Sequence, residues 1–179
     1  MTKVRSFQDY LTRIRQVAEA ATPATALRFC AWTLRRFPEL FGDDVWDGLT
    51  PAETGSLREM LRTFDLAATE GAPLPADRVV ALELDLLAFG PTDDDDAPAV
   101  HPDAIEFRGA VWTALEYCRT QNIDEICALS ERLMNSLDYN LDPRPEGCGL
   151  DNLFTFPRMQ RELEAHLLAL AGDGRPGIG

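Results

Sequence analysis

The chain has 179 residues, of which 45% are hydrophobic and 26% are charged, and this size and composition are typical of one globular domain. The net charge of −13 argues against nucleic-acid binding, because an acidic surface repels phosphate. With no apolar N-terminal leader, no apolar run long enough to span a membrane and no CxxC pair among four cysteines, the sequence predicts a cytoplasmic protein that binds no membrane.

The N-terminal part of the chain predicts two consecutive helices. Ser6 can cap a helix over residues 7–21, in which apolar side chains recur every three or four positions and form one stripe. A second helix begins at Pro23, after a threonine that can cap it. Because the residue before a proline disfavours the α conformation, we expect this helix to end at Pro38.

Residues 38–49 contain two glycines and three aspartates, and they predict a loop with at most a short helical turn around Trp46. Thr50 and Glu53 then form the pattern of a capping box, in which each side chain satisfies a backbone N–H at the start of a helix. The helix that follows should end at Gly71, since glycine readily adopts the left-handed conformation found at helix C-termini.

Residues 75–89 carry an ambiguous pattern. The segment from Leu82 to Leu86 alternates between apolar and acidic residues, as a half-buried strand would. The whole segment is nevertheless long, rich in leucine and alanine and poor in β-branched residues, and Val80, Leu84 and Leu87 keep helical spacing. We therefore predict a helix.

The C-terminal half predicts three more helices. Residues 90–102 hold three prolines and four consecutive aspartates, which indicate a solvated loop. Helices over residues 103–120 and 123–137 follow, and the short turn between them should place them antiparallel. A last helix begins near Pro157 and ends at Gly172.

Residues 138–155 show no helical period. Such a long stretch is uncommon inside a compact domain and is often functional, so a ligand pocket beneath it is one hypothesis. The motif Asp138-x-Asn140-x-Asp142 matches the first half of an EF-hand loop. The glycine and the glutamate that the rest of such a loop requires are replaced by proline and glycine, so we do not predict calcium binding.

These elements define an all-α fold, an irregular bundle of six to seven helices. We expect a single helical domain over residues 1–179, in which about residues 172–179 form a frayed tail. A chain of this length can bury a core without disulfides or metals.

No catalytic, metal-binding or cofactor-binding motif is visible. His101 lies in a predicted loop, and His166 lies on the apolar face of the last helix, where a hydrogen-bonded core histidine is the usual finding. Neither belongs to a known nucleophile motif, and the cysteines lack the local spacing of a zinc site. We predict no catalytic residue, no metal and no cofactor, which favours a protein that is not an enzyme.

Acidic residues dominate the chain after residue 36. Residues 1–36 carry seven bases and two acids, whereas residues 37–179 carry 10 bases and 28 acids. This charge would attract a basic protein. An acidic surface can also do no more than keep a protein soluble. The second helix adds a tryptophan flanked by arginines, an arrangement that forms interface hot spots and also covers cores. The candidate partner-binding residues are Asp43, Asp44, Asp47, Asp93, Asp94, Asp95 and Asp96, together with Arg28, Trp32, Arg35 and Arg36.

Three stretches carry a family resemblance. They are residues 26–40 (ALRFCAWTLRRFPEL), residues 114–138 (ALEYCRTQNIDEICALSERLMNSLD) and residues 156–170 (FPRMQRELEAHLLAL). In these stretches the chain resembles the DUF416 (YjaG-like) family, an uncharacterised group of small helical bacterial proteins. The resemblance implies an all-helical bundle and transfers no catalytic residue.

The sequence therefore predicts a non-enzymatic acidic interaction protein, and its sharpest form is an immunity-like or antitoxin-like protein that neutralises a basic toxin. Two alternatives stay open. One is a small-molecule or peptide-binding helical domain, enzymatic or not, with its pocket beneath residues 138–155. The other is self-association through Trp32, Trp46 or Trp112.

Overall fold

The computed structural model describes residue 4 and residues 6–89, 99–140 and 156–172 of the chain. This described part contains seven α-helices, one 3-10 helix and no strand, which confirms the predicted all-α class. The elements are α1 (Phe7–Ala20), α2 (Pro23–Phe41), η1 (Gly42–Trp46), α3 (Pro51–Glu70), α4 (Ala76–Leu87), α5 (Pro102–Thr120), α6 (Ile123–Tyr139) and α7 (Pro157–Ala171). The aspartates at 93–96, residues 141–155 and the tail after Gly172 lie outside the described residues.

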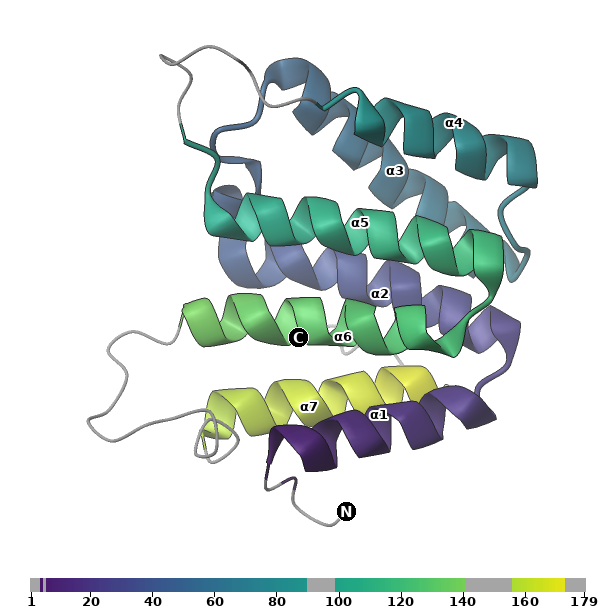
Figure 1. Cartoon of the computed structure of the whole chain (residues 1–179), viewed down its shortest axis with the longest axis vertical. Coiled ribbons are helices and arrows are strands. Elements are labelled where there is room, and N and C mark those ends of the chain that lie inside the picture. Colours follow the sequence, from purple (N-terminus) through teal and green to yellow (C-terminus); the bar gives the residue numbers. More distant parts are fainter. Residues whose placement is uncertain (1–3, 5, 90–98, 141–155, 173–179) are drawn as a thin grey trace.

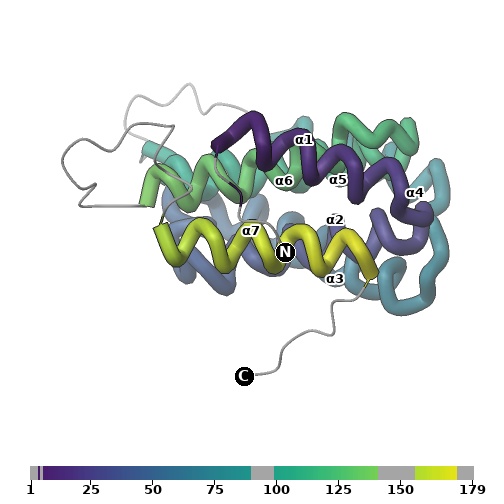
Figure 2. The backbone as a smooth tube through the Cα atoms, turned by 90° about the horizontal axis from the view of Figure 1, so that it is seen from below, coloured from purple at the N-terminus to yellow at the C-terminus, as the bar shows by residue number. Residues whose placement is uncertain are grey.

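The helices pack in two layers. Figure 2 shows α1, α6, α5 and α4 in one layer and α7, α2 and α3 in the other. The central helix is α2, which contacts α3, α5, α6 and α7. Helices α5 and α6 lie side by side and antiparallel (Figure 1), as the short turn between them predicted. Helices α3 and α4 form one edge of the bundle, and α1 and α7 form the opposite edge (Figure 1).

Local capping signals determine where the helices begin. The Ser6 side chain accepts a hydrogen bond from the backbone N–H of Asp9, and Thr50 and Glu53 form both hydrogen bonds of the predicted capping box. These caps satisfy N–H groups that have no partner within the helix. Gly71 ends α3 in the left-handed conformation, with a φ of 65°. The predicted starts of α1 and α3 and the predicted end of α3 are therefore confirmed.

The prediction that Pro38 ends the second helix is wrong, because α2 continues to Phe41. Proline removes one backbone hydrogen bond and crowds the preceding turn. Packing keeps the last turn helical: the rings of Phe37 and Phe41 are both buried with their centroids 5.9 Å apart. The Phe37 ring also lies 5.5 Å from the ring of Phe107 in α5. Burial of these aromatic rings outweighs the missing hydrogen bond.

The ambiguous segment 75–89 contains a helix, α4, as predicted. Its buried residues are Val79, Leu82 and Leu86, which lie three and four positions apart and share one face. The alternation that resembles a strand arises because leucines also occupy the opposite, exposed face of the helix.

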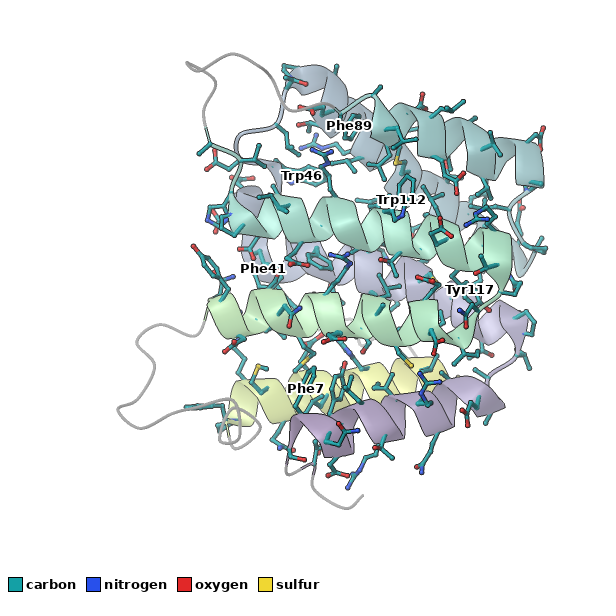
Figure 3. The ribbon with its side chains drawn as sticks, viewed as in Figure 1. Phe7, Phe41, Trp46, Phe89, Trp112 and Tyr117 are labelled. Carbon is teal, nitrogen blue, oxygen red and sulfur yellow. The ribbon has the colours of Figure 1, made fainter. Side chains whose placement is uncertain are left out.

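Aromatic side chains fill the space on both sides of α5. In the view of Figure 3, Trp46, Trp112 and Phe89 lie toward the α3–α4 pair, whereas Phe41 and Tyr117 lie toward α6. Trp46 and Trp112 are partly buried and pack against the core. None of the described helices is both long enough and apolar enough to cross a membrane.

Candidate functional site

Apolar residues occupy the face of α4 that points away from the bundle. Val80, Leu84 and Leu87 are 49%, 62% and 64% exposed, and Ala81 and Ala88 beside them are exposed too. At about 100° per residue these five positions form one stripe along the helix surface. Because α4 lies at the edge of the bundle, no other described helix covers this stripe (Figure 1). We call residues 80, 81, 84, 87 and 88 the outer stripe of α4.

Acidic residues border the outer stripe. Asp77 precedes it and Asp85 lies beside it, and both residues are exposed and form no ion pair with any described residue. Arg78, the single base in α4, reaches toward α3, where its guanidinium donates to Thr63 Oγ1 at 3.2 Å and lies 3.4 Å from Glu59. The outer stripe is therefore an apolar surface with an acidic border, as in the centre and rim of many protein interfaces.

A second surface lies at the end of the bundle where η1 meets the start of α5. Here the chain exposes three of the predicted partner-binding aspartates, Asp43, Asp44 and Asp47. The backbone N–H of His101 donates to the Asp47 carbonyl at 3.2 Å, which fastens the two segments together. The structure thus places the Asp44 carboxylate beside His101 and Asp103, residues that the sequence pattern did not connect with it.

Gly48 allows this contact between η1 and the start of α5. Its φ is 76°, and a Cβ atom added to it would lie 2.6 Å from the Cα of Val100 and 2.8 Å from the Ala99 carbonyl oxygen. Only glycine lets the backbone at residue 48 approach the chain at residues 99–100 this closely.

We expect Gly48→Ala to lower the free energy of unfolding by about 3 kcal/mol, because alanine adds strain at positive φ and collides with backbone that cannot rotate away. Equilibrium urea unfolding measures the loss. Gly55→Ala is the matched control: a Cβ added there has nothing within 4 Å, so alanine should stabilise α3 by up to about 1 kcal/mol. A loss below about 1 kcal/mol for Gly48→Ala would contradict the tight contact.

On the tryptophan–arginine face of α2, Arg36 and Trp32 make contacts within the molecule. Arg36 donates two hydrogen bonds to the buried carboxylate of Glu162 in α7, at 3.0 and 2.7 Å. Its guanidinium carbon also lies 5.8 Å from the centre of the Trp32 ring. Trp32 stacks on Phe29 at 5.9 Å and meets the ring of His166 edge-on at 5.3 Å. The sequence left two interpretations of this face, an interface hot spot or a cover for the core. The structure supports the second, because Trp32 is partly buried against the core.

The other two predicted arginines lie closer to solvent. Arg35 lies 3.4 Å from Asp65 in α3, and both side chains are more than a third exposed. Arg28 is exposed and donates to Thr25 Oγ1 at 3.1 Å.

A buried polar cluster joins α1, α6 and α7. The hydroxyls of Tyr10 and Ser130 hydrogen-bond to each other, and Ser130 Oγ lies 2.5 Å from Nδ1 of His166. The Tyr10 hydroxyl lies 3.3 Å from the same nitrogen, while Nε2 lies 3.8 Å from Oε1 of Glu162. Tyr10, Ser130 and His166 have no exposed surface. The prediction that His166 is a hydrogen-bonded core residue is confirmed.

This cluster contains the residue types of a catalytic triad, yet its position rules out that role. Burial lowers the pKa of His166 to about 4 and raises the pKa of Tyr10, so both side chains are neutral near pH 7. A catalytic serine must reach its substrate, and Ser130 is fully enclosed. The cluster therefore ties three helices together and does not form an active site.

The described cysteines also lack the features of a reactive site. Cys30, Cys118 and Cys127 carry free thiols. Burial raises the pKa of Cys118 to about 12 and also raises the pKa values of Cys30 and Cys127. A thiol that stays protonated is a weak nucleophile and a poor metal ligand. These cysteines pack as small apolar side chains.

The outer stripe of α4 was not among the sites predicted from the sequence, although the pattern contains a signal for it. On a helical projection, Val80, Leu84 and Leu87 fall opposite Leu82 and Leu86. A helix at the edge of a bundle can bury only one of two apolar faces in its own core, so the other face stays exposed.

Comparisons with protein-family models, with curated proteins and with solved structures found no match to this chain.

Proposed function

We propose that this protein is a non-enzymatic helical interaction protein that binds a basic protein partner. The observation that carries the proposal is the outer stripe of α4, an apolar surface with an acidic border that no described helix covers. Contiguous exposed apolar surface is uncommon on monomeric proteins and marks contact sites.

The occupant that fits the outer stripe is an amphipathic helix with lysine or arginine beside its apolar face. Its apolar residues would lie along Val80, Leu84 and Leu87, and its basic residues would meet Asp77 and Asp85. A second copy of this chain fits less well, because each chain carries a net charge of −13 and two stripes would bring their acidic borders together.

An immunity-like or antitoxin-like role is the sharpest form of this proposal. A basic toxin, such as a nuclease, has the charge that an acidic surface attracts, and blocking it requires no catalytic residue. The free thiols fit the reduced cytoplasm as the compartment. The all-helical fold fits the resemblance to the DUF416 (YjaG-like) family, and that relationship is part of the proposal.

The alternative of a ligand pocket beneath residues 138–155 falls mainly outside the described residues. A hollow of about 430 Å³ between the start of α5 and the end of α6 borders that segment at Asp138 and Tyr139. Asp103 and Glu106 line it as well, so its chemistry favours a cation over an apolar ligand.

The test of the proposed function is affinity capture from the native host with three tagged forms of the full chain, at low and at high salt. The forms are the wild type, Leu84→Gln/Leu87→Gln in the outer stripe, and the control Leu168→Gln, which changes an exposed leucine of α7. We expect the wild type and the control to recover the same basic protein in stoichiometric amount at low salt and less of it at high salt. The outer-stripe variant should lose it.

Both leucines of the outer-stripe variant are exposed, so its free energy of unfolding should change by less than about 0.5 kcal/mol, as measured by urea unfolding. Recovery of the same partner by all three forms would reject the stripe as the contact. Recovery of no stoichiometric partner at either salt concentration would reject the interaction function itself.

A further inference from the structure

Three groups that commonly ligate metals converge where η1 meets the start of α5. One carboxylate oxygen each of Asp44 and Asp103 and one ring nitrogen of His101 lie within 4.8 Å of one another. The Gly48 contact and the hydrogen bond from the His101 N–H to the Asp47 carbonyl hold the two segments in this arrangement. These backbone contacts therefore bring Asp44, His101 and Asp103 together.

The carboxylate of Asp103 is buried without a permanent positive charge beside it. Asp103 is 1% exposed, and its single ion-pair partner among the described residues is His101, whose Nδ1 lies 3.6 Å from Oδ2. The Asn140 side-chain amide lies within hydrogen-bond distance of both Asp103 oxygens, at 3.1 and 2.9 Å, which orients the carboxylate but adds no charge. Buried carboxylates are usually paired with a cation or bound to a metal.

A second, independent observation lies in the adjoining hollow of about 430 Å³. Ser136 lines this hollow together with Asp103, and its Oγ atom is buried with no hydrogen-bond partner among the described residues. A buried hydroxyl without a partner is uncommon and calls for a water or a ligand nearby. The hollow is large enough to hold several waters.

We propose that Asp44, His101 and Asp103 bind one divalent transition-metal ion of the Zn²⁺ type, whose remaining coordination positions are filled by water. The two carboxylates supply the two negative charges that neutralise the ion. The imidazole favours Zn²⁺ over Mg²⁺ and Ca²⁺, which prefer oxygen ligands alone. Ser136 Oγ would accept a hydrogen bond from a water in the hollow that Asp103 also lines.

The His101 ring already accepts a hydrogen bond that metal binding could displace. In the structure its Nδ1 accepts a hydrogen bond from the backbone N–H of Asp103 at 3.2 Å and caps α5. An ion bound to Nδ1 would replace that hydrogen bond, whereas an ion bound to Nε2 would leave it intact. The ring keeps its edge-on contact with Tyr139 at 6.3 Å, which helps to fix its orientation. This site is separate from the outer stripe of α4, and it does not depend on the proposed interaction function.

The experiment is isothermal titration of Zn²⁺ into the metal-free full chain. We expect one ion per chain, and we expect Asp44→Asn and His101→Asn each to weaken the affinity by more than about 10-fold, which is the loss from removing even a group that only orients a ligand. Asp44 is exposed, and asparagine is a good N-cap in place of His101, so both variants should fold. The matched control Asp43→Asn removes the same charge from the neighbouring exposed residue and should leave the affinity unchanged.

A second probe distinguishes this site from the thiols. Co²⁺ bound by nitrogen and oxygen lacks the strong near-ultraviolet thiolate absorption that cysteine ligation produces, and we expect its absence here. The proposal is overturned by a chain that binds no Zn²⁺. It is equally overturned by Zn²⁺ binding that Asp44→Asn and Asp43→Asn weaken to the same extent, or by Co²⁺ spectra that show thiolate ligation.

Discussion

Glu162→Ala should lower the free energy of unfolding by about 3 kcal/mol, because it leaves the guanidinium of Arg36 without its buried partner. Glu162 is buried in α7 and accepts two hydrogen bonds from Arg36 in α2, a paired geometry that is stronger than a single contact. The side chain of Arg36 is 25% exposed and keeps Glu39 at 2.8 Å, so the loss stays at the lower end of the range for buried pairs. Urea unfolding measures it.

Two further variants distinguish the effect of losing the buried ion pair from the effect of removing any glutamate. Glu59→Ala removes an exposed carboxylate that also lies near arginine and should cost less than about 1 kcal/mol. The double change Arg36→Met/Glu162→Leu should recover most of the loss, since replacing both partners by apolar groups leaves no buried charge unpaired. Equal losses for Glu162→Ala and Glu59→Ala would show that the pair contributes nothing beyond a surface contact.

The stability of the protein should fall by about 3 kcal/mol as the pH decreases from 6.5 to 4, because of His166 alone. Burial lowers its pKa in the folded protein from 6.5 to about 4. Above pH 6.5 the ring is neutral in both states and the contribution is fully present. Between pH 6.5 and 4 the unfolded chain takes up a proton that the folded chain does not, so unfolding becomes progressively easier.

Urea unfolding at a series of pH values from 8 to 4.5 checks this result, with His166→Gln as the comparison. Glutamine can keep a hydrogen bond to Ser130 but cannot titrate. The variant should be less stable than the wild type near pH 7, and it should lack the wild-type decline between pH 6.5 and 5. Parallel pH profiles for the two proteins would mean that His166 takes up its proton in the folded state as readily as in the unfolded state.

The bounds of the helices were predictable because their signals are local. Ser6 and the Thr50–Glu53 box act on backbone groups within a single turn, so a short stretch of sequence contains all the necessary information. The end predicted at Pro38 failed for the opposite reason. The turn stays helical because the Phe37 ring packs on Phe107, which belongs to a helix far along the chain. The sequence around Pro38 contains no signal for this contact.

The candidate sites were predictable only in part. Polarity was enough to predict that Asp43 and Asp44 face solvent, but not that Asp44 meets His101 and Asp103. That meeting depends on the close backbone approach at Gly48, which no periodicity reveals. Conversely, the apolar outer stripe of α4 follows from helical spacing once the helix is known to lie at the edge of the bundle.

The side-by-side packing of α1 and α7 bears on how the chain folds as it is synthesised. Tyr10 is synthesised well before Ser130 and His166, the two residues that its hydroxyl contacts. Domains generally fold as units during translation. Helix α1 therefore stays solvated or loosely packed until α6 and α7, which it contacts, have been synthesised. A ribosome that stalls between α6 and α7 would release a product in which α1 lacks its contact with α7, and such a fragment is a natural substrate for chaperones and proteases.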